Sequence, residues 1–145
     1  MCFRKKAKPE IVEPEKIKPT SIERISLSDL TVLLSVKFPA ASLYLSDYDF
    51  LLCSPNDIAL FLAQNETNKM GYVAEKRDCD DFAYRLMGDF SIPEWSDLCL
   101  GIMWTDNHAF NLFVTEEREI LFIEPQTDEI SETIPLGGTP RIVVI

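Results

Sequence analysis

Three segments carry apolar residues at the three- and four-residue spacing of an amphipathic helix: residues 28–38, 54–62 and 78–88. Each opens on a serine or an aspartate, the side chains that cap helix N-termini, and the second has Pro55 at its first helical position. The inward-facing positions are Leu30, Leu33, Leu34, Phe38, Ile58, Phe61, Leu62, Phe82, Ala83, Leu86 and Met87. Pro39 and Gly88 are expected to end the first and third helices.

The last third of the chain changes to the two-residue alternation of strands. Strands are predicted over 98–104, 108–114, 119–124 and 141–145, with hairpin turns at 105–107 and 115–118. Two shorter strands are expected at 43–45 and 50–53, around the polar turn Ser46-Asp47. Helices followed by strands predict an α+β fold, with N-terminal helices packed on a C-terminal antiparallel sheet.

The chain divides into a short arm and one domain. Residues 1–20 contain six of the fourteen basic side chains and three of the nine prolines, a composition typical of a solvated arm that could contact a protein partner. Residues 21–145 are long enough for a single domain with its own core, and 46 % of the whole sequence is apolar.

The formal net charge of −10 argues against binding nucleic acid or an anionic membrane. No apolar run is long enough to cross a membrane, and the basic N-terminus lacks the apolar stretch of a signal peptide. Four cysteines show no paired metal-binding spacing, and Cys53 and Cys99 lie among apolar neighbours as expected for buried thiols. We therefore expect a reduced protein in the cytoplasm or within a phage particle.

Candidate chemistry centres on Cys79, on His108, the only histidine, and on Glu124. A thiol, an imidazole and a carboxylate in this order supply a nucleophile, its base and the group that orients the base. Cys79 is expected in the first turn of a helix, where free backbone N–H groups favour a thiolate. The hairpin turn near 115–118 places residue 108 opposite residue 124 or 125, so Glu124 is expected beside His108. Each residue also has an ordinary structural interpretation, as a buried thiol, a hydrogen-bonded histidine and a solvated strand end.

These residues carry a resemblance to a known family. Asp-Cys-Asp-Asp-Phe-Ala (78–83), His-Ala-Phe-Asn (108–111) and Ile-Glu-Pro-Gln (123–126) resemble the C-terminal domain of the Marasmius oreades agglutinin and related small bacterial and phage proteins. The resemblance covers roughly residues 42–130 and implies a papain-like cysteine protease fold with Cys79, His108 and Glu124 as the catalytic residues. The order and the His-Ala-aromatic motif are also similar to transglutaminase-like domains.

The resemblance also implies calcium dependence, with Asp80 and Asp81 as candidate ligands because calcium binds oxygen. Without a cation or a capping role, Asp78, Asp80 and Asp81 would oppose ionisation of the thiol. Two departures from the family are visible. The sugar-binding trefoil of the agglutinin is missing, so lectin activity is not expected to carry over, and no oxyanion-hole glutamine lies within the six residues before Cys79.

The sequence therefore predicts a papain-like thiol hydrolase, a peptidase acting on a peptide or protein substrate through a Cys79-His108-Glu124 triad. One alternative is a non-catalytic accessory or virion module, of phage or bacterial origin, that keeps the fold and binds a partner. The other is a transglutaminase-like acyltransferase.

Overall fold

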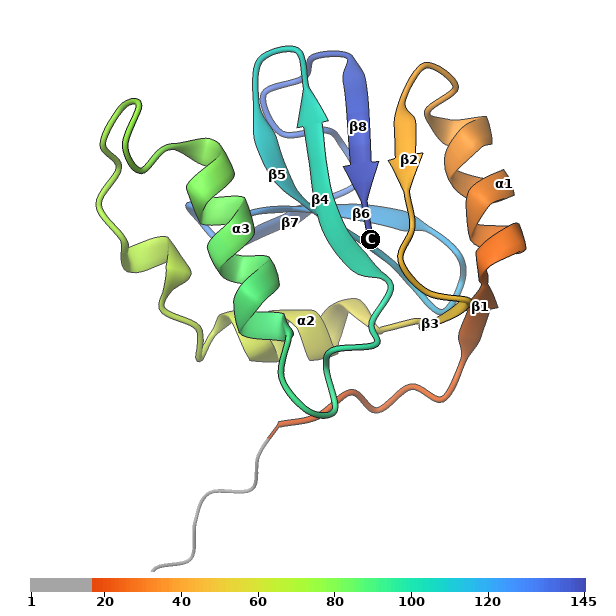
Figure 1. The fold of residues 1–145 in the computed structure, drawn as a ribbon. Coiled ribbons are helices and arrows are strands. Elements are labelled where there is room, and N and C mark those ends of the chain that lie inside the picture. Colours follow the sequence, from red (N-terminus) through yellow and green to blue (C-terminus); the bar gives the residue numbers. More distant parts are fainter. Residues whose placement is uncertain (1–16) are drawn as a thin grey trace, which may run out of the picture.

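The computed structural model describes residues 17–145, in which a six-stranded sheet lies between helices (Figure 1). The helices are α1 (Leu27–Lys37), α2 (Pro55–Leu62), the short 3-10 helix η1 (Thr67–Lys69) and α3 (Cys79–Phe90). The strands are β1 (Arg24–Ser26), β2 (Ser42–Tyr44), β3 (Asp49–Leu51), β4 (Leu100–Thr105), β5 (Ala109–Val114), β6 (Ile120–Glu124), β7 (Glu129–Ser131) and β8 (Pro140–Val144). The large sheet has the order β2-β8-β4-β5-β6-β7, and β1 pairs with β3 in a separate two-stranded sheet.

The α+β class predicted from the sequence is confirmed, but the sheet is mixed instead of antiparallel. Strand β2 comes from the helical half of the chain and pairs in parallel with β8, with Leu43 opposite Val143. The segments 43–45 and 50–53 do not pair with each other. The second of them contributes to β3, which pairs with β1, a strand that the sequence pattern did not reveal. Close packing of β4 on β8 depends on Gly101, where an added Cβ would lie 1.9 Å from the Val144 carbonyl oxygen.

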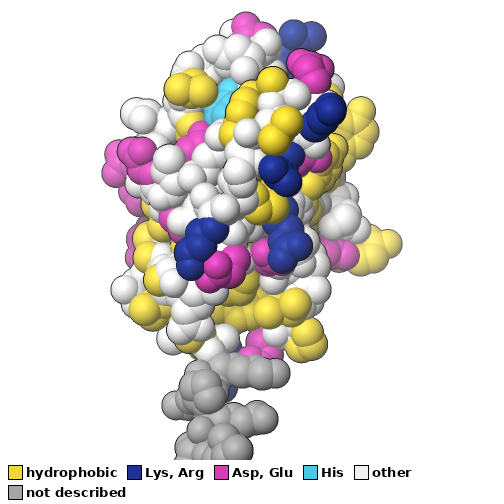
Figure 2. All heavy atoms as spheres, turned by 90° about the vertical axis from the view of Figure 1, so that its left-hand side faces the viewer, with side chains coloured by type: hydrophobic (Ala, Val, Ile, Leu, Met, Phe, Trp, Pro, Cys, Tyr) yellow, Lys and Arg dark blue, Asp and Glu magenta, His cyan; other side chains and the backbone are white. Residues whose placement is uncertain are grey.

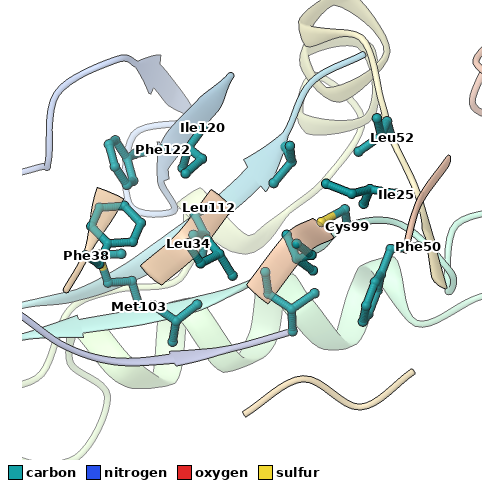
Figure 3. Close-up of a cluster of buried hydrophobic side chains, with 14 of the residues drawn as sticks. Ile25, Leu34, Phe38, Phe50, Leu52, Cys99, Met103, Leu112, Ile120 and Phe122 are labelled. Atoms are coloured by element: carbon teal, nitrogen blue, oxygen red, sulfur yellow. The ribbon is translucent and has the colours of Figure 1, made fainter. Parts of the chain in front are cut away.

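Two apolar clusters fill the two faces of the sheet. Side chains of α1 pack on one face against Phe110, Leu112 and Phe122 (Figure 3). On the other face, α2 and α3 pack against Phe113 and Ile123. Alternation along β5 thus sends neighbouring residues into different clusters, as its period-two pattern predicts.

Local capping fixes where the helices begin. The hydroxyl of Ser54 accepts a hydrogen bond from the Asp57 amide at 3.1 Å, with Pro55 following as predicted. Helix α1 begins one residue before the predicted segment, because Ser26 provides its cap. Helix α3 continues past Gly88 to Phe90, whose ring stacks on Phe61 with centroids 3.8 Å apart, so tertiary packing outweighs the glycine stop signal.

The described part of the predicted arm contacts the domain. The Trp95 indole N–H donates to the Ile17 carbonyl at 2.9 Å, and both the amide and the hydroxyl of Thr20 donate to Asp57. Residues 1–16, with Cys2 and five of the six basic side chains of the arm, lie outside the described residues. Within residues 17–145, no helix is long and apolar enough to cross a membrane.

Candidate functional site

His108 and Glu124 form a short hydrogen bond at one end of the sheet. His108 Nε2 lies 2.6 Å from Glu124 Oε2, and the two side chains are 4 % and 15 % exposed. The second carboxylate oxygen, Oε1, accepts a hydrogen bond from the Gln126 amide at 3.2 Å. The carboxylate therefore holds the imidazole in one orientation.

The hairpin brings these residues together in a different register from the one predicted. Asn111 lies opposite Ile123 and Leu112 opposite Phe122, so continuing this register places Glu124 opposite Phe110 and not opposite His108. His108 and Phe110 are two residues apart and share a face of the strand. Glu124 therefore reaches His108 along the diagonal, within the range of cross-strand side-chain contacts.

The turn before His108 is fixed by Thr105. Its hydroxyl accepts a hydrogen bond from the His108 amide at 3.1 Å and lies 2.8 Å from the Asn107 side-chain oxygen. Gly138, with φ +91°, packs against the same turn, where an added Cβ would lie 2.8 Å from Thr105 Oγ1. The backbone that carries the imidazole is thus held from two sides.

Cys79 is the first residue of α3, as predicted, and its side chain is half-buried. Helix α3 is attached to β5 through Asn111, whose side-chain amide donates to the Ala83 carbonyl at 3.0 Å and to the Gly101 carbonyl at 3.1 Å. Within residues 17–145, no hydrogen bond links the Cys79 thiol to His108 or Glu124. The catalytic role of the three residues therefore stays a prediction.

Asn111 is a positioning residue that the sequence reasoning missed. It is fully buried in the run Ala-Phe-Asn-Leu-Phe-Val of β5. A single amide inside an apolar strand was the available signal, because a buried polar side chain needs hydrogen-bond partners. Here those partners are the backbone of α3 and of β4.

The acidic residues around Cys79 separate into two roles. Asp81 accepts a hydrogen bond from the Asp78 amide at 3.2 Å and thereby caps α3. The pKa of Asp80 is raised because its protonated carboxyl group can share a hydrogen bond with the Asp78 carboxylate, and burial adds to the shift. Ligand atoms of Asp78, Cys79 and Asp80 lie within 4.8 Å of one another. Of the two predicted metal ligands, Asp80 thus belongs to this cluster, whereas Asp81 is turned to the helix backbone; calcium binding stays a prediction.

A groove opens beside Glu124, between the edge strand β7 and residues 133–136. Its volume is about 460 Å³. The polar side chains of its wall are Glu124, Gln126, Thr127, Glu129, Ser131 and Thr133. The apolar ones are Ile134, Pro135 and Leu136. The groove therefore offers carboxylate, amide and hydroxyl groups beside an apolar surface.

Seen from the side of α3, the only histidine of the chain reaches the surface as a small patch, with hydrophobic and acidic side chains close to it (Figure 2). Thus the His108–Glu124 pair is largely enclosed, whereas the groove next to Glu124 is open.

The fold is shared with a fungal lectin. A structure described as a PSL1a–E64 complex superposes with a TM-score of 0.73 and 22 % identity, over 84 % of this chain and 50 % of that chain. The Polyporus squamosus lectin bound to the human-type influenza-binding epitope Neu5Acα2-6Galβ1-4GlcNAc gives 0.70 and 22 %, over 84 % of this chain and 49 % of that chain. The chain thus spans about half the length of these lectins. No family model and no curated protein matches the sequence.

These likenesses define the class of the protein as an α+β protein with a fold found in an agglutinin-like lectin. They contradict the predicted thiol peptidase, because both of these structures are of a lectin. The error has a physical reason: the order of a cysteine, a histidine and a carboxylate along the chain does not by itself fix a reaction, because each of these side chains can also have a structural role. A shared fold does not fix the chemistry of the site.

Proposed function

We propose that this chain is a non-catalytic binding module whose ligand is a carbohydrate, bound in the groove beside Glu124. The observation that carries the proposal is the shared fold with a lectin, one structure of which is bound to an oligosaccharide. Because the chain spans only half of that lectin, the groove itself must supply the further support.

The groove suits a neutral, hydroxyl-rich ligand. The carboxylates of Glu124 and Glu129 accept hydrogen bonds from sugar hydroxyls, and Ser131 and Thr133 both donate and accept them. The apolar side of the groove faces the C–H surface of a sugar ring. A volume of about 460 Å³ lies within the usual range for small-molecule sites, roughly 300–1,000 Å³.

Charge favours a neutral glycan over a sialylated one. Two carboxylates line the groove, and the whole chain carries a net charge of −10. The carboxylate of a terminal sialic acid would be placed against charges of the same sign. We therefore expect this chain to prefer Galβ1-4GlcNAc-type neutral oligosaccharides to their sialylated forms.

The finer fold assignment also belongs to this proposal. A helix that opens on Cys79, attached to a hairpin that pairs His108 with Glu124, supports a papain-like arrangement. In a binding module this arrangement acts as a scaffold, so that the His108–Glu124 pair holds one wall of the groove.

The test is a binding assay with the full chain against Galβ1-4GlcNAc and Neu5Acα2-6Galβ1-4GlcNAc, immobilised within a panel of neutral and acidic glycans. We expect binding to neutral members of the panel. Glu129→Gln should weaken that binding about ten-fold or more, since a hydrogen bond to a charged group contributes about 1.5–3 kcal/mol. Glu117→Gln, at the opposite end of β6, is the matched control and should bind as the parent does.

Cys79→Ala should bind the same glycans with unchanged affinity, because the proposal needs no thiol. Failure of the whole panel to bind, or equal affinity of the Glu129→Gln variant and the parent, would overturn the carbohydrate proposal.

A further inference from the structure

Asn68 of η1 and Asp128 of the β6–β7 turn form a polar pair that is only half satisfied. Asn68 Nδ2 donates to Asp128 Oδ2 at 2.7 Å, across 60 residues of chain. The remaining oxygen of each side chain, Asn68 Oδ1 and Asp128 Oδ1, is shielded from solvent and has no hydrogen-bond partner among the described residues. Two buried acceptors without a donor cost free energy, because each loses its hydrogen bonds to water and gains none in the protein.

The pair is held from both sides. On one side, Asn65 and Thr67 fix η1 by donating to Asp89 of α3 at 2.8 and 3.2 Å. On the other side, the Asp128 amide donates to the Glu124 carbonyl at 2.9 Å, and the Asp128 backbone has φ +62°. The backbone segments that carry the two side chains are therefore held in place on both sides of the pair.

A proton on Asp128 would supply the hydrogen-bond donor that the two free oxygens lack. Solvent does not reach either free oxygen, so neither a water molecule nor a metal ion has access to them as the side chains stand. A carboxylic acid has one O–H donor, and an amide has both an N–H donor and an oxygen acceptor. Two planar groups of this kind can exchange two hydrogen bonds, N–H to O and O–H to O, and leave no acceptor unpaired.

We propose that Asp128 and Asn68 form a proton-dependent clasp, in which protonated Asp128 Oδ1 donates to Asn68 Oδ1 while Asn68 Nδ2 donates to Asp128 Oδ2. The clasp joins η1 to the β6–β7 turn. Thr127 and Glu129, on either side of Asp128, line the groove. The clasp is thus a positioning device for that wall, and its effect on ligand binding rests on the proposed function.

The charges near the clasp are few. Burial raises the pKa of Asp128, whereas the hydrogen bond from Asn68 and the charge of Lys69 act in the opposite direction. Lys69 is itself paired with Glu66 at 2.7 Å. The hairpin contributes only negative groups, Glu124 and Glu129, and on α3 Asp89 is paired with Arg85.

The raised pKa of Asp128 fixes how the stability of the clasp changes with pH. Because the folded-state pKa of Asp128 lies above its unfolded value, the clasp is intact at low pH. Its contribution to stability is lost as the pH rises through the folded pKa.

The experiment is an NMR pH titration of the labelled full chain without any glycan. We expect the Asp128 carboxyl carbon to titrate above the value of aspartate in unfolded peptides, about 3.9. The side-chain amide of Asn68 and the backbone amides of Thr127 and Glu129 should shift with the same midpoint. Asp128→Asn, which can replace the acid by an amide at a backbone conformation that asparagine tolerates, should melt at a higher temperature than the parent at pH 7 and lose this titration.

A midpoint at or below that of unfolded aspartate, or an Asn68 amide that does not respond to it, would overturn the clasp. A midpoint that moves when calcium is added would show that the pair holds a metal ion and not a proton. Since no glycan is present, failure here is distinct from failure of the carbohydrate proposal.

Discussion

Two polar pairs anchor the same β6–β7 hairpin, and they solve the same problem differently. Glu124 is paired with His108, and Asp128, four residues later, is paired with Asn68. Both oxygens of Glu124 have donors, one from the imidazole and one from the Gln126 amide. Asp128 has one donor for two oxygens, and its partner has an unpaired oxygen as well.

The difference lies in the number of donors that the surrounding backbone can offer to each carboxyl group. Glu124 ends a strand where the chain turns back, so a backbone N–H points at its side chain. The backbone N–H of Asp128 is already used by the Glu124 carbonyl. A buried carboxyl group that is short of donors, as Asp128 is, gains by keeping a proton.

The largest effect is expected from breaking the His108–Glu124 pair, in which both carboxylate oxygens have donors. Glu124→Ala leaves a buried ring nitrogen of His108 without its hydrogen-bond partner, and we expect a loss of up to about 3 kcal/mol in the free energy of unfolding. Glu124→Gln should lose less, since an amide oxygen can still accept from the ring. Urea denaturation at pH 7 measures both variants. A loss below about 1 kcal/mol in Glu124→Ala would mean that the short contact adds little to stability.

A smaller effect is expected from breaking the Asn68–Asp128 pair, in which one oxygen of each side chain lacks a donor. Asn68→Ala removes the one donor to the Asp128 carboxyl group found among residues 17–145 and should lower the free energy of unfolding by about 1–2 kcal/mol at pH 7. Lys69→Gln is the control next to it, because its ion pair with Glu66 is exposed and such pairs contribute about 0–1 kcal/mol. If the two variants melt alike, Asn68 is not a structural link between η1 and the hairpin.

The sequence predicts the first pair and not the second, for a physical reason. His108 and Glu124 lie on strands with clear alternation around one short turn, so their proximity follows from local geometry even though the register differs by one or two residues. Asn68 and Asp128 lie in polar loops without periodicity, far apart in the chain, and only tertiary packing joins them. The parallel β2–β8 pairing escaped prediction for the same reason.

The function was the weakest part of the prediction. The helix start at Cys79 and the neighbourhood of His108 and Glu124 could be read from caps, turns and alternation. The peptidase prediction required a further step, from residue order to reaction, and the lectin likeness contradicts it. The groove beside Glu124 could not be predicted at all, because strand β7 and the loop 133–136 have no distinctive pattern.

Thiol reactivity tests whether the His108–Glu124 pair changes the reactivity of Cys79. Burial raises the pKa of Cys53 and of Cys99 to about 12, so at pH 8 only on the order of one such thiol in 10⁴ is ionised. In the native protein we expect iodoacetamide to modify Cys79 and to spare Cys53 and Cys99, as peptide mass mapping would show. If His108 activates the thiol, as the sequence predicts, His108→Gln should slow the reaction of Cys79 several-fold at pH 6–7. An unchanged rate in a variant with a native circular dichroism spectrum would restrict the pair to a structural role.

The smallest effect is expected from calcium at a third polar pair, which consists of two carboxyl groups, Asp78 and Asp80. Like Asp128, Asp80 has a raised pKa, but here the first cause is a hydrogen bond that protonated Asp80 shares with the neighbouring Asp78 carboxylate. This pair lies at the half-exposed start of α3, where an ion can replace the shared proton. Calcium at five times its Kd would stabilise the folded state by about 1 kcal/mol, measured as a higher melting temperature in calcium than in EDTA. Asp80→Asn should abolish the difference. Asp81→Asn should melt lower in both buffers, because it weakens the helix cap, and should keep the difference. Identical melting curves of the parent in calcium and EDTA would contradict calcium binding at Asp78 and Asp80.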